Sequence, residues 1–97
     1  MKAKVRKMQS FDYTLGCVGG LHARPAGAIV TAAKNFSSDI LIRMLSPDGA
    51  READGKRLIS VMSLGARRGD TITFLINGPD ERDAAEKLHT VCRESIG

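Results

Sequence analysis

With 97 residues and 42% apolar content, the chain is expected to fold as a single domain, residues 1–97, around a modest aliphatic core. No apolar run approaches the roughly 20 residues that cross a bilayer, and no apolar stretch of a secretory signal follows the basic residues 1–7, so we expect a cytoplasmic protein that does not insert into membranes. The net charge of +4 is mild and dispersed, and few aromatic side chains are present for base stacking, so nucleic acid is not an expected partner.

The first half of the chain predicts two strands and a helix. Residues 10–15 alternate polar and apolar side chains, as a half-buried strand does. After a glycine-rich loop, an amphipathic helix is predicted from residue 23 to about residue 34, with an apolar face made of Ala26, Ile29, Val30 and Ala33. The next strand places alternate apolar residues on one face, namely Ile40, Ile42 and Met44. The sequence SPDG at residues 46–49 is typical of a type I turn.

The second half predicts two more strands and two more helices. A weakly encoded strand covers residues 50–54, and a short helix covers residues 57–64 before Gly65 ends it. Residues 71–76 alternate as a clear strand. Asp80 is predicted to cap a last helix, with a buried stripe made of Ala85, Leu88, Val91, Cys92 and Ile96. The order βαββαβα, with short connections, predicts an α+β fold in which antiparallel strands carry the helices on one face.

The sequence GLHARPAG at residues 20–27 places a histidine at the start of the first predicted helix. The first N–H groups of a helix have no partner within it and the helix dipole is positive there, so this position favours an anion. Arg24 adds a planar cation suited to phosphate oxygens, Pro25 needs no N–H in the first turn, and the small Ala23 leaves the helix start uncrowded. A nucleophilic imidazole in this place predicts that His22 accepts a phosphoryl group.

The residues alone leave other roles for His22 open. An imidazole also serves as a metal ligand or a general base, but His89 and the isolated Cys17 and Cys92 do not have metal-ligand spacing. We therefore expect no metal, no cofactor and two reduced thiols. The remaining alternative is a surface histidine that merely caps the helix, with Arg24 solvated beside it.

Residues 20–26, the sequence VMSLG at residues 61–65 and RGD at residues 68–70 together resemble the HPr family, the histidine phosphocarriers of the bacterial sugar phosphotransferase system. The resemblance spans residues 10–96 and agrees with the predicted order of elements. It implies an open-faced β-sandwich, with four antiparallel strands in the order 1-4-2-3 and three helices on one face.

The resemblance also implies a function. It identifies His22 as the residue that takes a phosphoryl group on Nδ1 from Enzyme I and gives it to sugar-specific IIA components, with Arg24 as the active-centre arginine and Pro25 as the proline that follows. Such a protein is a monomeric carrier with a phosphohistidine intermediate, and it is not a turnover enzyme by itself. The alternative is a regulatory module of the same fold that binds target proteins according to its phosphorylation state.

A partner-binding face is predicted on the short second helix. Spacing alone is compatible with a buried stripe that includes Leu58, Val61 and Met62, whereas the resemblance implies that Leu58, Ile59 and Met62 contact partners. An exposed apolar patch beside a polar reactive centre is the expected anatomy for docking.

The chain departs from the family pattern in two places. Arg57 occupies the position at which many members carry a regulatory serine, so no regulatory serine is expected. Either Arg57 is a tolerated surface substitution, or it adds positive potential near the active centre. The connection between the second and third strands, residues 45–56, is predicted to be a longer loop than the family pattern.

Overall fold

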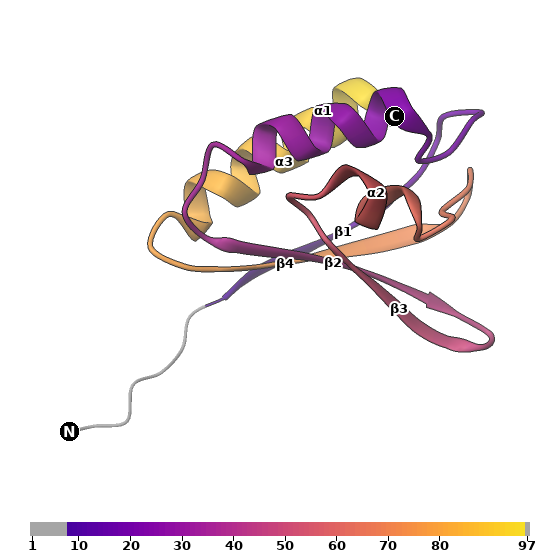
Figure 1. The fold of residues 1–97 in the computed structure, drawn as a ribbon, viewed down its shortest axis with the longest axis horizontal. Coiled ribbons are helices and arrows are strands. Elements are labelled where there is room, and N and C mark those ends of the chain that lie inside the picture. The colour runs from indigo at the N-terminus through magenta and orange to yellow at the C-terminus, as the bar shows by residue number, and fades with distance from the viewer. Residues whose placement is uncertain (1–7, 97) are drawn as a thin grey trace.

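The structure, a computed structural model, describes residues 8–96 and contains one four-stranded sheet covered on one face by helices (Figure 1). The chain order is β1 (Gln9–Thr14), α1 (Ala23–Ala33), β2 (Asp39–Ser46), β3 (Gly49–Asp54), α2 (Leu58–Met62), β4 (Thr71–Asn77) and α3 (Glu81–Ser95). All strand pairs are antiparallel and the strands lie in the order β1-β4-β2-β3. The predicted fold class, order of elements and strand order are confirmed.

The core lies between the sheet and the helices, and alternation along the strands selects its residues. In β2 and β4 every second side chain is buried, which gives the inward set Ile40, Ile42, Met44, Ile72, Phe74 and Ile76. Phe74 pairs with Phe11 across the strands, and their rings stack with centroids 4.7 Å apart. The helices add aliphatic side chains, including Ile29 and Leu88. No helix within residues 8–96 is long and apolar enough to span a membrane.

The helix α3 is rotated slightly from the predicted orientation. Ala84 is fully buried, whereas the predicted Ala85 is only half-buried. The physical reason is that α3 packs against α1 as well as the sheet, which favours the row of side chains four residues apart that joins Ala84 to Leu88 and Cys92. His89 is exposed, and its ring meets the rings of Phe11 and Tyr13 edge-on, with centroids 5.2 and 5.8 Å away.

Asp80 does not cap α3 with its side chain, contrary to the prediction. Its carboxylate instead accepts hydrogen bonds from the backbone N–H groups of Ser37 and Ser38, at 2.9 and 3.0 Å, and from the hydroxyl of Ser38 at 2.6 Å. Ser38 is 0% exposed. The carboxylate of Asp80 therefore satisfies a buried polar group in the loop before β2 and does not cap its own helix. Near the start of α3, Glu81 Oε1 accepts the N–H of Gly78.

Stability is expected to fall in acid through Asp80. The hydrogen bond from the Ser38 hydroxyl and then that from the Ser37 N–H hold the pKa of Asp80 below its ordinary value of 3.8. A lowered pKa in the folded state means that the stabilisation is complete above the ordinary value and is lost as the pH falls through the folded-state value. Chemical denaturation should therefore show a lower free energy of unfolding for Asp80→Asn than for wild type at neutral pH. The two proteins should converge in acid, and a constant difference at every pH would contradict this assignment.

The expected long loop between β2 and β3 is instead an extended hairpin. The two strands pair continuously from Leu41 with Asp54 to Ser46 with Gly49, so only Pro47 and Asp48 form the turn. The Ser46 hydroxyl donates to the carbonyl of Gly49 at 2.9 Å. The hairpin projects beyond the helices (Figure 1), and the additional residues therefore lengthen strands rather than a loop.

The second helix is shorter than predicted. The structure has α2 at Leu58–Met62 instead of residues 57–64, with Arg57 as its N-cap residue. The N–H groups of Leu64 and Gly65 bond to carbonyls three residues earlier, and Gly65 has φ +67°. The chain therefore tightens after Met62 and leaves the α-helix two residues earlier than predicted. The other elements begin and end within a residue or two of their predicted bounds.

Candidate functional site

His22 is the N-cap residue of α1 and its imidazole is exposed. Its backbone is extended, with φ −83° and ψ −171°, its N–H donates to the carbonyl of Gly20 at 2.9 Å, and its carbonyl accepts the N–H of Ala26 at 3.0 Å. The side chain makes no capping hydrogen bond to the helix. The backbone alone starts the helix, so the imidazole does not cap it and the ring is free for chemistry.

Unpaired amides surround the start of α1. Within residues 8–96 the N–H groups of Ala23 and Arg24 have no hydrogen-bond partner, and Pro25, buried in the first turn, has no N–H. The first bond within the helix is the one from Ala26 to His22. These two free donors and the positive end of the helix dipole lie beside the imidazole, and together they favour an anionic group there.

Gly19 sets which edge of the imidazole faces the protein. A side chain at this position would place its Cβ 2.5 Å from Cδ2 and 2.9 Å from Nε2 of His22. The Cδ2–Nε2 edge of the ring therefore packs against the bare backbone of Gly19. The other ring nitrogen, Nδ1, lies on the opposite side of the imidazole and faces away from that contact.

The loop that presents His22 is built on the connection between α2 and β4. Gly20 has φ +65°, and a Cβ there would lie 2.8 Å from the Cα of Arg67 and closer still to the carbonyl oxygen of Ala66. The buried Leu21 donates its N–H to that same carbonyl at 3.0 Å. This contact could not be predicted from the sequence, because a glycine in a loop does not by itself show which distant backbone it touches.

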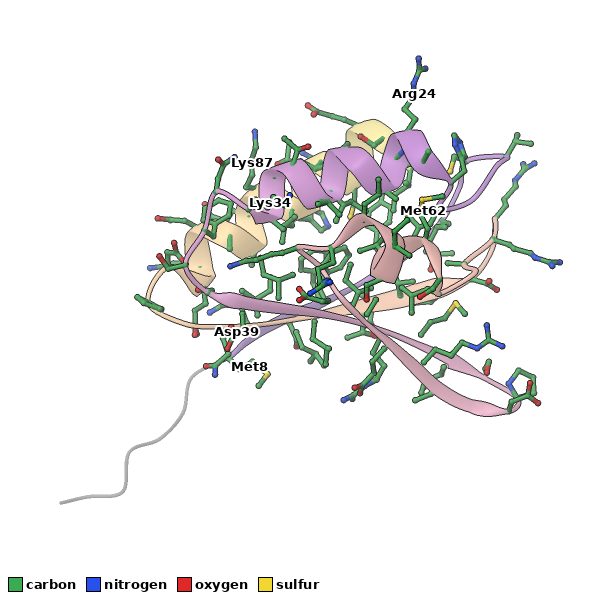
Figure 2. The ribbon with its side chains drawn as sticks, viewed as in Figure 1. Met8, Arg24, Lys34, Asp39, Met62 and Lys87 are labelled. Carbon is green, nitrogen blue, oxygen red and sulfur yellow. The ribbon has the colours of Figure 1, made fainter. Side chains whose placement is uncertain are left out.

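Arg24 is not held against His22. Its side chain is exposed and projects away from the body of the protein (Figure 2), and within the described part of the chain it makes no hydrogen bond or ion pair. The guanidinium therefore forms no hydrogen bond with the imidazole in this structure. The guanidinium is free to rotate towards an anion that arrives at the helix start, two residues from His22.

The predicted partner-binding residues of α2 differ in exposure. Ile59 is 76% exposed and Leu58 39% exposed, whereas Met62 is half-buried and packs against the core. Val61 is fully buried, so the core stripe of this helix runs through Val61 rather than Leu58. Val18, which was not predicted to bind a partner, is 84% exposed in the loop before His22. The feature of the sequence that could have indicated it is an apolar residue within a glycine-rich segment.

Three exposed arginines and two free cysteines are the next residues of interest. Arg57, Arg67 and Arg68 are exposed, and none of them forms an ion pair within residues 8–96. Neither Cys17 nor the buried Cys92 is in a disulfide. Cys17 donates its Sγ–H to the carbonyl of Gly20 at 3.2 Å. Burial raises the pKa of the Cys92 thiol to about 12, which keeps it protonated. The described residues contain no cluster of three or more His, Cys, Asp or Glu side chains that could hold a metal ion.

Comparison with known proteins identifies the family. A family model described as "PTS HPr component phosphorylation site" matches residues 9–94. The chain belongs to the HPr family. HPr proteins are the phosphocarriers of the phosphotransferase system, in which a phosphohistidine carries the group during sugar transport.

Individual relatives agree with this membership. The phosphocarrier protein HPr of Mycoplasma genitalium is 36% identical over 77 residues, which cover 79% of this chain and 84% of that protein. The multiphosphoryl transfer protein of Xanthomonas campestris pv. campestris is 35% identical over 83 residues, 86% of this chain but only 9% of its own length. The solved structure of a histidine-containing phosphocarrier protein from Mycoplasma superposes with a TM-score of 0.81 at 26% identity, covering 91% of this chain and 96% of that one.

Proposed function

We propose that this chain is a cytoplasmic, monomeric phosphocarrier in which His22 accepts a phosphoryl group from Enzyme I and donates it to IIA components of sugar permeases. The observation that carries the proposal is the exposed imidazole at the start of α1, beside the free N–H groups of Ala23 and Arg24. The general role follows from membership of the HPr family. The identity of the two partners and the role of each site residue are the proposed parts.

In the proposed reaction, the Nδ1 lone pair of His22 attacks the phosphorus of the donor. The N–P bond forms while the bond between phosphorus and the donor breaks, and the electron pair of that bond leaves with the donor. The second transfer is the same step with the roles exchanged, since a nucleophile of the IIA component attacks and the imidazole leaves. His22 is regenerated, so the chain acts as a carrier and not as a turnover enzyme.

The free amides are suited to a temporary anion. The N–H groups of Ala23 and Arg24 would donate to phosphoryl oxygens, and the helix dipole adds to their effect. Backbone donors and one rotating guanidinium stabilise the charge without enclosing it, because His22 and Arg24 are both exposed. The group therefore remains accessible to the next partner.

Arg24→Ala is expected to slow phosphoryl transfer by about tenfold or more, because a charge-assisted hydrogen bond to the phosphoryl group is lost. The side chain makes no ion pair in the described structure, so the midpoint of thermal unfolding should not change. Arg24→Lys keeps the charge but not the planar fork and should recover part of the rate. Stopped-flow transfer from phosphorylated Enzyme I measures the effect, and wild-type kinetics in Arg24→Ala would remove the residue from the mechanism.

The proposed docking surface comprises Ile59, Leu58 and Val18, with Met62 contributing at its edge. The exposed apolar side chains supply area that a partner can bury. Arg67 and Arg68, in the turn that supports Gly20, and Arg57 at the start of α2 are exposed and unpaired, and their charge favours partners with acidic surfaces.

Arg57→Ser is expected to weaken binding of Enzyme I at low salt, mainly through slower association, because a rim charge acts on encounter. The difference from wild type should shrink as the ionic strength rises. Surface plasmon resonance at two salt concentrations measures it, and equal association rates at low salt would make Arg57 a tolerated surface substitution.

Incubation with Enzyme I and phosphoenolpyruvate tests the function directly. Intact mass spectrometry should show one added phosphate that acid removes, as expected of phosphohistidine. An unmodified protein would refute the carrier role and favour the regulatory module, whereas an acid-stable phosphate would indicate a serine.

A further inference from the structure

The net positive charge of the chain is confined to residues 1–7. This segment contains four of the fifteen basic residues and none of the eleven acidic ones; the four are Lys2, Lys4, Arg6 and Lys7. Residues 8–97 hold eleven of each sign and are formally neutral. The site at His22 does not explain this asymmetry, because β1 begins at the end of the molecule opposite the start of α1 (Figure 1).

An open groove of about 380 Å³ lies along β2 and β3, and its charged lining consists of Lys56 and three carboxylates. The carboxylates belong to Asp39, Glu52 and Asp54, and Leu41 supplies an apolar wall. Strand alternation places these four side chains on the sheet face away from the helices, since their neighbours Ile40 and Ala53 are buried on the helical side. The groove is therefore an acidic feature of the open face.

Little of this negative charge is neutralised by the described residues. The carboxylate of Asp39 makes no hydrogen bond or ion pair within residues 8–96. The carboxylate of Asp54 accepts only the uncharged backbone N–H of Lys56, and the ammonium of Lys56 donates to the carbonyl of Phe36 at 2.7 Å. Glu52 forms an ion pair with Arg43 at 2.8 Å. Two of the three carboxylates are thus available to further cations.

The segment 1–7 starts within reach of this groove. Met8 precedes a strand in which Ser10 and Asp12 face away from the core, and Figure 2 shows Met8 and Asp39 projecting from the same side of the sheet. The strand β2 lies two strands from β1, a distance of about 10 Å. Seven extended residues span up to about 24 Å, so the segment is long enough to cross β4 and reach the carboxylates.

We propose that residues 1–7 bind the acidic groove on the open face of the same chain, with their basic side chains against Asp39 and Asp54. The tether makes this contact intramolecular, which raises the effective concentration of the segment at the groove into the millimolar range. The contact is solvent-exposed, so salt weakens it. The proposal goes beyond phosphoryl transfer, because it concerns the sheet face opposite the helices and leaves the His22 end free.

Amide chemical shifts of the full-length protein test the proposal at about 0.02 M and about 0.5 M salt. In wild type, the signals of Leu41 and Asp54 should move between the two salt concentrations as the segment dissociates. In the variant Lys4→Glu/Arg6→Glu this movement should be lost. The matched control Lys34→Glu/Lys87→Glu makes the same charge change on the helical layer (Figure 2) and should respond like wild type. Adding Asp39→Lys to the first variant should restore the movement.

Three outcomes would overturn the proposal. The first is an equal salt response of Leu41 and Asp54 in wild type and in Lys4→Glu/Arg6→Glu. The second is a response that grows with protein concentration, which would assign the contact to a second copy of the chain. The third is binding of wild type to vesicles of anionic lipid with no change at the groove, which would assign the segment to a membrane surface. Phosphorylation of His22 should be equal in all variants. Failure of the proposed contact between residues 1–7 and the groove is therefore distinguishable from failure of the carrier function.

Discussion

Replacing His22 with alanine is expected to abolish phosphoryl acceptance from Enzyme I and phosphoenolpyruvate. The imidazole is the proposed nucleophile, and a methyl group has no lone pair to replace it. The fold should be unchanged, because the side chain is exposed and makes no capping bond to α1. Intact mass after incubation measures acceptance, and circular dichroism with thermal unfolding checks the fold.

His89→Ala is the matched control, since it removes the other histidine of the chain. His89 packs edge-on against Phe11 and Tyr13 at the junction of α3 and β1. Its loss should leave phosphoryl acceptance at the wild-type level. Acid-labile phosphate on His22→Ala, or an unphosphorylated His89→Ala that is still folded, would contradict the assignment of His22.

Gly20→Ala is expected to destabilise the protein by about 2 kcal/mol or more and to impair phosphoryl acceptance. The residue has φ +65°, and its Cβ would collide with the backbone of Ala66 and Arg67. Neither atom belongs to a flexible side chain, so the loop itself must move. Because the N–H of His22 bonds to the carbonyl of Gly20, that movement displaces the reactive residue. Chemical denaturation and the transfer rate measure the two effects.

Gly27→Ala makes the same chemical change at the next glycine along the chain, and its effect on the free energy of unfolding should have the opposite sign. Gly27 lies inside α1, and a Cβ there meets no atom within 4 Å. Alanine in a helix interior is favoured over glycine by about 0.5–1 kcal/mol, so the variant should be more stable than wild type. Equal effects at the two positions would show that the contact with Ala66 does not govern the site.

The order and the faces of the elements could be predicted because they depend on local patterns. Alternation in β2 and β4 and helical spacing in α1 each select one buried face without knowledge of the partner. The N-terminal position of His22 on α1 could be predicted in the same way, since the proline in the first turn and the preceding glycines mark where the helix begins.

The predictions from the sequence are wrong where a residue has more than one available partner. Asp80 precedes a helix and satisfies the ordinary rule for a cap, yet its carboxylate binds Ser37 and Ser38, more than 40 residues earlier in the chain. Met62 and Leu58 both fit a buried stripe, and only the packing of α2 decides that Met62 is the more buried. Hydrogen bonds and packing between distant segments compete with the local conformational preference of a residue. The spacing of residues along the sequence does not show which of the two prevails.

The amino-acid sequence by itself determined the family, through motifs at residues 20–26, 61–65 and 68–70. It also determined the order of strands and helices and the histidine at the start of α1, because these depend on residues close together in the chain. Tertiary structure alone decided how that histidine is presented. The support of Gly20 by Ala66 arises where the loop meets the α2–β4 connection, while one edge of the imidazole lies against Gly19 and Arg24 points outward. The physical reason is that backbone close approach and side-chain exposure depend on which distant segments share the same space.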